Sequence, residues 1–324
     1  MDKILVLIHT VEGGALPNAA LETLAAAQSL GGEVVTGVFG EGAGPSIGSL
    51  AVEGEAFAQA RYATDAAACE ALIKASGAAI VLAPHTSRMA RALPGAAARL
   101  GGVVDTHVVA VNTSDGAVEA SRWFYRQRIE GTFSRAARPW VVLIEPGSYE
   151  PAEAAPAAAV TKLEVTVGSK TQMVGFESPE TGEQTIRPDA ETLFVAGAGW
   201  TKKQKDGQTH TPEAAELIMG FVRGAKSSLG SSKSLVDMGS EGQSVLPFLT
   251  HLHQIGQTGS TPRHKKGLAT CCHGEEPHVV GWRFVRERRA VNMDANCGWA
   301  RGKADVLYVA DAFEVMRELN RLLG

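Results

Sequence analysis

Short apolar runs that alternate with helical patterns constrain the fold of this chain more than any other feature. In the first half, runs with the composition of buried strands occupy residues 4–8, 34–39, 78–83, 103–111 and 140–144. Helical patterns cover residues 18–30, 65–75 and 87–100. Strands and helices in this alternation form parallel sheets that are covered on both faces. We therefore expect a doubly wound α/β domain.

The same alternation returns after a break in the pattern. Residues 146–159 are rich in Pro and Ala and predict a crossing segment, and residues 161–185 predict exposed extended chain. Further strands are predicted at 193–195, 235–236, 268–271, 290–293 and 306–310. One helix is predicted to open at Thr211-Pro212 with a hydroxyl N-cap, and the last at Asp311 with a capping box to Glu314. The prediction is two doubly wound parallel-sheet domains, residues 1–187 and 188–324.

Composition excludes several classes of protein. Hydrophobic residues make up 44% of the 324 residues, which is too apolar for a disordered chain. The net charge of −4 gives no global field for nucleic acid, and no apolar run approaches the roughly 20 residues of a membrane helix. The first residues lack a signal-peptide pattern, and four cysteines are too few for a disulfide framework. We expect a cytoplasmic, reduced protein.

Four patterns in the second half could carry chemistry, and each has a plainer alternative. Gly256-Gln257-Thr258-Gly259 could expose backbone N–H groups to an anion or a flavin edge, or be a simple turn. The turn at 197–199 lacks the full G-x-G-x-x-G spacing. A metal site is not predicted, because the spacing of Cys271, Cys272, His273 and His278 does not suit zinc. A cluster of arginines favours a solvated or partner-facing surface over nucleic-acid binding; its members are Arg283, Arg286, Arg288 and Arg289.

Residues 255–315 resemble the FAD-binding domain of the electron transfer flavoprotein alpha subunit. The family's V-G-Q-T-G loop, S-G-A-I-Q-H turn, I-N-K-D strand end and A-D…D-L-F-E-V ending correspond to residues 255–259, 273–278, 291–294 and 304–315. In the first half, residues 4–8, the Leu82–Ser87 turn and residues 138–140 match the family's opening strand, L-A-P-x-T-S turn and closing strand. The resemblance covers nearly the whole chain.

The resemblance implies a cofactor, FAD, and a set of residues that hold it. Thr258 would lie near flavin N5 in the loop of Ile255, Gly256 and Gln257, and His278 would lie at the flavin pyrimidine carbonyl. The turn that begins with His273 and Gly274 would bind the pyrophosphate. The remaining implied contacts are Ser232 and Lys233 beside the flavin, and Asn292 and Asp311 at the adenosine end.

The resemblance also implies a function without substrate chemistry. The chain would be an electron carrier that pairs with a beta subunit, accepts electrons from a flavin dehydrogenase and delivers them to a quinone-linked or other acceptor. Its FAD domain would swing on a hinge near residues 185–190, and the arginine cluster would dock acidic partners. A non-redox nucleotide-binding scaffold subunit of a larger dehydrogenase assembly is the alternative.

Four departures from the family pattern keep that alternative open. The arginine of the family's G-G-R-G turn has no counterpart in residues 197–200, where only Lys202, Lys203 or Lys205 could supply charge nearby. Lys233 replaces an arginine and loses its planar fork. His273, Glu275 and Glu276 stand in the phosphate turn, where carboxylates repel a pyrophosphate. The segment between residues 237 and 256 is longer than in the family.

Overall fold

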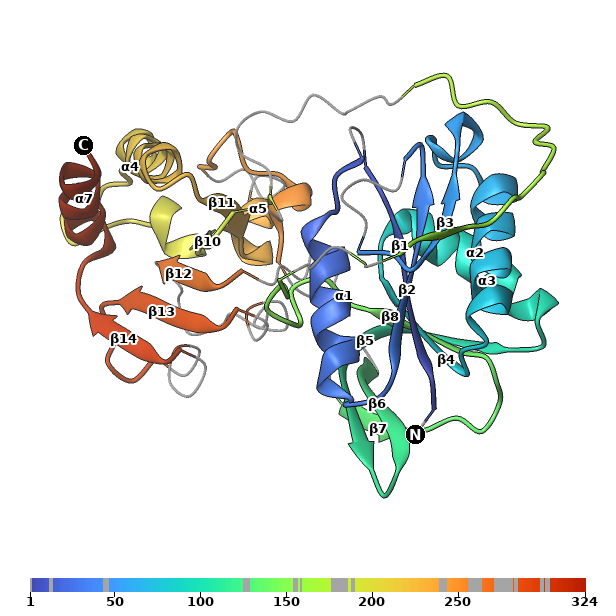
Figure 1. Ribbon diagram of the computed structural model, residues 1–324. Coiled ribbons are helices and arrows are strands. Elements are labelled where there is room, and N and C mark those ends of the chain that lie inside the picture. Colours follow the sequence, from blue (N-terminus) through green and yellow to red (C-terminus); the bar gives the residue numbers. More distant parts are fainter. Residues whose placement is uncertain are drawn as a thin grey trace. The chain divides into compact units, whose positions relative to one another are not determined.

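The chain forms two α/β units (Figure 1), which confirms the predicted fold class. The computed structural model describes residues 2–11, 14–42, 47–124, 129–153, 157, 159–175, 186–187, 190–238, 244–255, 264–270, 282, 285–297, 300 and 304–324. The two compact units are Met1–Phe176 and Glu177–Gly324. The predicted boundary after residue 187 stays a prediction, as does the predicted hinge near residues 185–190, of which residues 185, 188 and 189 lie outside the described part of the chain.

The first unit is built on a sheet in the order β7-β6-β5-β8-β4-β1-β2-β3-β9. In chain order these strands are β1 Ile4–His9, β2 Val34–Gly40, β3 Leu50–Glu53, β4 Ile80–Pro84, β5 Val103–Ser114, β6 Ala117–Phe124, β7 Ile129–Phe133, β8 Trp140–Ile144 and β9 Thr161–Lys162. Along the sheet order β5-β8-β4-β1-β2-β3-β9, all neighbouring strands pair in parallel, as expected. By contrast, β6 pairs antiparallel with both β5 and β7. The predicted parallel sheet thus carries an antiparallel extension at this edge, which was not predicted from the sequence. Asp115 and Gly116, with φ of 50° and 78°, form the tight turn that reverses the chain there.

Helices cover both faces of the parallel part of this sheet. They are α1 Asn18–Ser29, α2 Tyr62–Ser76 and α3 Ser87–Arg99. Alternate side chains of β1 explain the arrangement, since Ile4, Val6 and Ile8 join the core under α1 and Leu5 and Leu7 join the core under α2 and α3. A strand that is buried on both faces therefore reads as a continuous apolar run.

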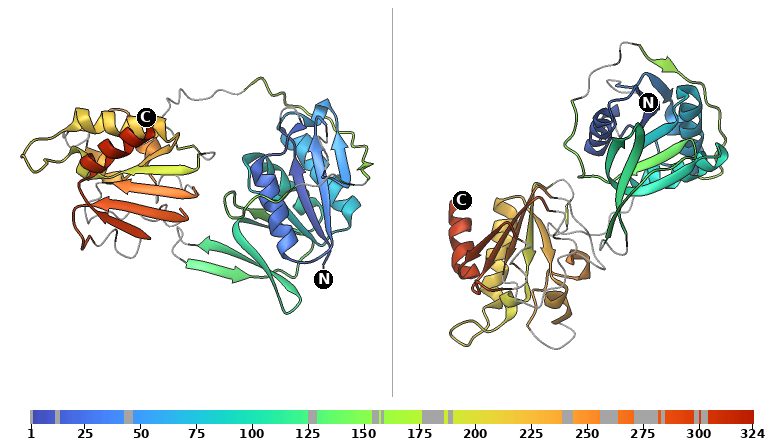
Figure 2. Two further views of the ribbon diagram at one scale, coloured as in Figure 1. Left: turned by 60° about the vertical axis from the view of Figure 1, so that its left-hand side comes forward. Right: turned by 90° about the horizontal axis from the view of Figure 1, so that it is seen from below.

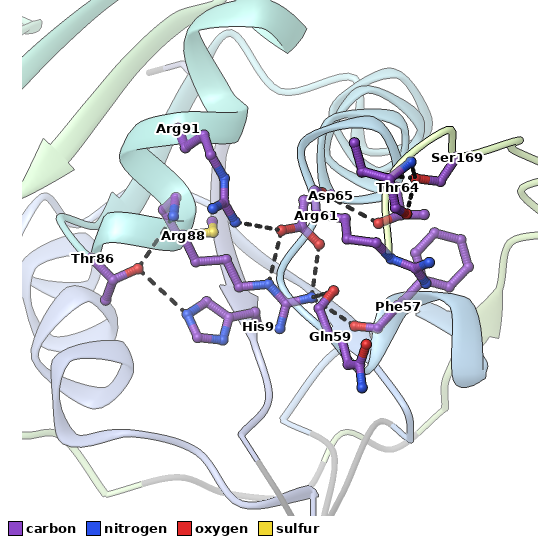
Figure 3. A network of polar contacts seen from close by, with 12 residues as sticks. His9, Phe57, Gln59, Arg61, Thr64, Asp65, Thr86, Arg88, Arg91 and Ser169 are labelled. Atoms are coloured by element: carbon purple, nitrogen blue, oxygen red, sulfur yellow. Dashed lines mark hydrogen bonds and ion pairs between the residues drawn. The ribbon is translucent and has the colours of Figure 1, made fainter. Parts of the chain in front are cut away.

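A buried ion pair joins the first turns of α2 and α3 (Figure 3). Arg88 donates two hydrogen bonds to the carboxylate of Asp65, at 2.7 and 3.0 Å, and Asp65 is fully buried. The same guanidinium donates to the carbonyl of Phe57 at 2.6 Å and to that of Gln59 at 3.4 Å. One side chain thus holds two helices and a connecting segment together.

His9 lies at the carboxyl end of β1, beside this ion pair (Figure 3). Its Nε2 lies 3.4 Å from the hydroxyl of Thr86, which caps α3 by accepting a hydrogen bond from the N–H of Met89. Burial lowers the pKa of His9 below its usual value of 6.5, and Arg88 acts in the same direction. Charging His9 therefore disfavours the folded state.

We expect acidification below about pH 6.5 to destabilise the first unit through His9. The unfolded chain binds a proton at His9 more readily than the folded chain, so stability is retained above the unfolded pKa and declines below it. Denaturant unfolding between about pH 7.5 and 5.5 would measure a shallower decline in a His9→Gln variant. Thr86→Val is the control, because it removes the cap and leaves His9 buried. A His9→Gln profile parallel to the wild-type profile would contradict this assignment.

The second unit contains a parallel sheet in the order β11-β10-β12-β13-β14. Its strands are β10 Thr192–Ala196, β11 Ser228–Ser231, β12 Lys266–Thr270, β13 Glu287–Asn292 and β14 Val306–Val309. Helices α4 Thr211–Gly224 and α7 Ala312–Leu323 pack side by side on one face (Figure 2). Residues of the described segments between β12 and β14, with Ile255, form the core on the other face. None of the described helices has the length and apolarity to cross a membrane.

Two local predictions in this unit were wrong. Residues 235–236 were expected to form a strand, but they belong to a short helix, α5 Lys233–Asp237, while the strand is Ser228–Ser231. Small residues make β11 inconspicuous in the sequence although it is fully buried. Thr211 is the first residue of α4 rather than its N-cap, which is His210 without a side-chain bond.

Candidate functional site

The carboxyl edge of the second sheet is the place where the topology favours ligand binding. When its five strands are numbered along the chain, their order across the sheet is 2-1-3-4-5 (Figure 1). The direction of winding therefore reverses between β10 and β12. In open α/β sheets, ligands bind outside the carboxyl ends of the strands near such a switch point. The predicted site residues Ser232, Asn292 and Asp311 all follow or end strands at this edge.

A cavity of about 260 Å³ opens where β13 and β14 end and α7 begins. Asn292 and Asp311, predicted from sequence as a pair, both line it. The other lining residues are Gly199, Gln204, Val291, Met293, Asp294, Ala310, Ala312 and Phe313. None of these was predicted as a site residue. All but Gln204 nevertheless belong to the turn at 197–199 or to the motifs at 291–294 and 304–315 that were noted in the sequence. The wall is mainly apolar, with polar groups at a few positions, as is usual in small-molecule sites.

Turn geometry fixes both predicted side chains in the cavity. Asp311 is the N-cap of α7, as predicted, and its Oδ1 accepts a hydrogen bond from the N–H of Phe313 at 2.9 Å. Asn292 Oδ1 accepts from the N–H of Asp294 at 2.9 Å, and the Asn292 carbonyl accepts from the N–H of Ala310 at 3.2 Å. The positive end of the helix dipole lies beside the Asp311 carboxylate. Both side chains are therefore held in place by backbone contacts.

The predicted flavin neighbours Ser232, Lys233 and Ile255 lie around the end of β11. Ser232 caps α5 by accepting a hydrogen bond from the N–H of Leu235 at 3.3 Å. Lys233 forms an ion pair with Asp237 at 3.1 Å. Ile255 is buried in the core, and its N–H donates to the carbonyl of Ser231 at 3.1 Å. Ile255 therefore anchors the start of the predicted loop through its buried side chain.

Ser231 was missed in the sequence because a lone serine carries no motif. It is the last residue of β11 and fully buried, and its hydroxyl has no hydrogen-bond partner among the described residues. A buried hydroxyl without a partner is costly in a folded protein. An acceptor or donor supplied by a bound molecule would remove that cost.

The turn after β10 departs from a nucleotide-binding turn in its structure as well as in its sequence. Residues 198–201 form a buried 3₁₀ turn, and Trp200 packs 4.6 Å from the ring of Phe313. The indole of Trp200 donates to the hydroxyl of Thr270 at 2.8 Å. The nearby lysines Lys202, Lys203 and Lys205 are all exposed. Lys205 also lines a second cavity, of about 220 Å³, together with Asp311.

Several predicted residues lie outside the described part of the chain. They are Gly256, Gln257, Thr258, His273, Gly274 and His278, together with Cys271, Cys272, Glu275, Glu276 and Arg283 of the other interpretations. In the described part of the arginine cluster, Arg288 pairs with Asp305 at 2.9 Å and Arg289 with Glu287 at 3.1 Å. Neighbouring carboxylates thus offset part of the positive charge of that surface.

Comparison with known proteins identifies the family. The family model described as electron transfer flavoprotein domain matches residues 4–168. The mitochondrial electron transfer flavoprotein subunit alpha of Oryza sativa subsp. indica is 27% identical over 343 residues, covering 96% of this chain and 88% of the relative. The electron transfer flavoprotein subunit alpha of Methylophilus methylotrophus is 26% identical over 340 residues, covering 100% of both chains. The resemblance seen in the sequence is thereby confirmed, and the chain belongs to the electron transfer flavoprotein domain family.

Proposed function

We propose that this chain is the FAD-binding alpha subunit of a heterodimeric electron transfer flavoprotein. The observation that carries the proposal is the convergence of Asn292 and Asp311 on one cavity at the carboxyl edge of the second sheet. The full-length similarity to alpha subunits supports the same assignment. In this proposal a beta subunit is the partner, a flavin dehydrogenase is the donor, and a quinone-linked or other redox protein is the acceptor. A cytoplasmic location is part of the proposal.

The described residues fit the adenosine portion of a flavin dinucleotide. The cavity is smaller than the roughly 300–1,000 Å³ of whole-ligand sites, so it suits one portion of a large cofactor. Its apolar wall offers packing for a flat base, and its two polar side chains offer hydrogen bonds. At the other side of the switch point, the buried hydroxyl of Ser231 provides a polar group that has no hydrogen-bond partner within the part of the chain that the structure describes.

Two residues of the cavity, Asp311 and Phe313, have distinct roles in this proposal. Asp311 uses Oδ1 for its helix cap, so its second oxygen can accept a hydrogen bond from a ribose hydroxyl. Phe313 contributes an apolar wall, and the fully buried ring of Trp200 supports it from the core side. When bound, FAD supplies the one- and two-electron redox chemistry. The chain itself positions the cofactor and breaks no substrate bond.

Flavin content of the assembled complex tests the proposal. We expect the chain, co-expressed and purified with its beta-type partner, to carry about one bleachable flavin per heterodimer in a stepwise reductive titration. Absorption spectroscopy, with chromatography of the released cofactor to identify it as FAD, makes the measurement. An assembled complex that holds no flavin would overturn the proposal. The non-redox scaffold would then be the better interpretation, supported by the core role of Trp200 and by the Lys233–Asp237 ion pair.

A further inference from the structure

Two histidines and a glutamate meet at the carboxyl edge of the first sheet, in the unit that the proposed FAD site does not use. His85 Nδ1 lies 3.1 Å from Glu145 Oε2, and His107 Nδ1 lies 2.8 Å from the same oxygen. The two imidazole rings are 4.0 Å apart between centroids and meet edge to face. Among the described residues, these three form a group whose ligand atoms all lie within 4.8 Å of one another.

The sheet topology creates this cluster. Strands β5, β8 and β4 are neighbours in the sheet (Figure 1), so the carboxyl ends of β4 and β8 lie beside the middle of β5, where His107 is. His85 directly follows β4 and its N–H donates to the carbonyl of Ile144, at the end of β8, at 2.7 Å. Glu145 directly follows β8 and its N–H donates to the carbonyl of Val108 in β5 at 2.8 Å. Main-chain hydrogen bonds thus hold the ligand-bearing segments in register.

His107 has an unusual backbone that brings it into the cluster. Its φ is 56°, in the left-handed region that non-glycine residues rarely occupy. The pairing of β5 with β8 shifts register between Asp105 and Val108, on either side of His107. Such bulges redirect a side chain, and strained residues concentrate at functional sites. In this backbone conformation, Nδ1 of His107 lies 2.8 Å from Oε2 of Glu145.

The spacing of the three side chains suits a metal ion. Zinc binds histidine nitrogen and carboxylate oxygen at about 2.0–2.2 Å, which in a tetrahedral site separates neighbouring ligand atoms by about 3.3 Å. The two nitrogen-to-oxygen distances of 2.8 and 3.1 Å need only small side-chain rotations to reach that value. His85 and Glu145 are mostly buried, while the His107 side chain is 64% exposed. The cluster therefore combines fixed ligands with an opening to solvent.

We propose that His85, His107 and Glu145 bind one divalent transition-metal ion of the zinc class. Two imidazoles and one carboxylate are a ligand set that zinc, cobalt and ferrous iron share. Three protein ligands leave at least one coordination position for water or for a ligand from another molecule. The sequence gives no sign of this site, because His85 and Glu145 are 60 positions apart. The site is independent of the proposed FAD function.

Metal titration of the full-length chain tests the proposal. After treatment with a chelator, the purified protein is titrated with Zn²⁺ by calorimetry and with Co²⁺ by absorption spectroscopy. We expect one saturable ion per chain, and about a 100-fold weaker Kd in His107→Gly and Glu145→Gln variants. Glycine is chosen at position 107 because it adopts φ of 56° without strain, so the variant keeps the fold while losing the ligand.

A matched control separates this site from other histidines. His251 is exposed and lies 3.7 Å from Asp237, so His251→Gln removes a surface histidine beside a carboxylate and should leave the Kd unchanged. Zn²⁺ should raise the melting temperature of the wild-type protein and of this control, but not of His107→Gly. Absence of saturable binding would overturn the proposal. So would binding that persists in His107→Gly and Glu145→Gln but disappears in Cys271→Ser.

Discussion

Replacing Arg88 with methionine is expected to lower the unfolding free energy of the first unit by about 3–5 kcal/mol. Asp65 is fully buried and would lose its bidentate hydrogen-bond partner. The carbonyls of Phe57 and Gln59 would lose their donor at the same time. Methionine fills much of the same volume, so the loss would reflect the polar contacts and not a large cavity. Amide hydrogen exchange in α2 and α3 would measure the effect in this unit alone.

Arg91 provides a matched control for the Arg88 prediction. It lies 3.7 Å from the same carboxylate, but its side chain is 47% exposed. Removing such a surface partner typically costs between about 0 and 1 kcal/mol, so Arg91→Met should change exchange little. An Arg88→Met/Asp65→Leu double variant should recover part of the loss, because no buried charge remains. If Arg88→Met and Arg91→Met behaved alike, the buried pair would not be the link between the helices.

The helices and strands that could be predicted from the sequence are those whose buried positions are occupied by apolar residues. Strands such as β1, β4 and β8 are buried on both faces and are therefore apolar along almost their whole length, which made them visible in the sequence. The edge strand β7 and its neighbour β6 have partly exposed faces and mixed composition, and they were missed. Strand β11 was missed for the opposite reason: it is fully buried, but it consists of Ser, Leu, Gly and Ser and is therefore not conspicuously apolar. Leu235 and Val236 nearby are more apolar, but they belong to a helix.

The candidate site shows a similar division between local and long-range information. Asp311 could be predicted as a helix cap from local sequence, and the resemblance paired it with Asn292. The burial of the Ser231 hydroxyl could not be predicted, because it depends on the packing of β11 against β10. The cluster of His85, His107 and Glu145 depends on the strand order β5-β8-β4 and on the bulge in β5. The spacing of the three residues in the sequence predicts neither of these features.

Asp311→Ala is expected to weaken FAD binding by roughly 10- to 100-fold in the assembled heterodimer. A hydrogen bond to a charged group contributes about 1.5–3 kcal/mol, which corresponds to that range. The carboxylate lies in the cavity beside Asn292 and is held there by its bond to the N–H of Phe313. The substitution also removes the cap of α7, at a cost of about 1 kcal/mol of stability. Titration of the flavin-depleted complex with FAD, followed by fluorescence, would give the Kd.

Asp311→Asn separates the binding role of this residue from its capping role. Asparagine caps a helix about as well as aspartate, so stability should be retained, but a neutral amide is a weaker acceptor for a ribose hydroxyl. Its Kd should therefore lie between those of the wild type and Asp311→Ala. Asp305→Asn is the control, since that carboxylate precedes β14 at the opposite end of the strand and pairs with Arg288. If Asp311→Ala lost stability but bound FAD as tightly as the wild type, Asp311 would be a helix cap and not a cofactor ligand. The adenosine end would then have to be sought elsewhere along the carboxyl edge of the second sheet.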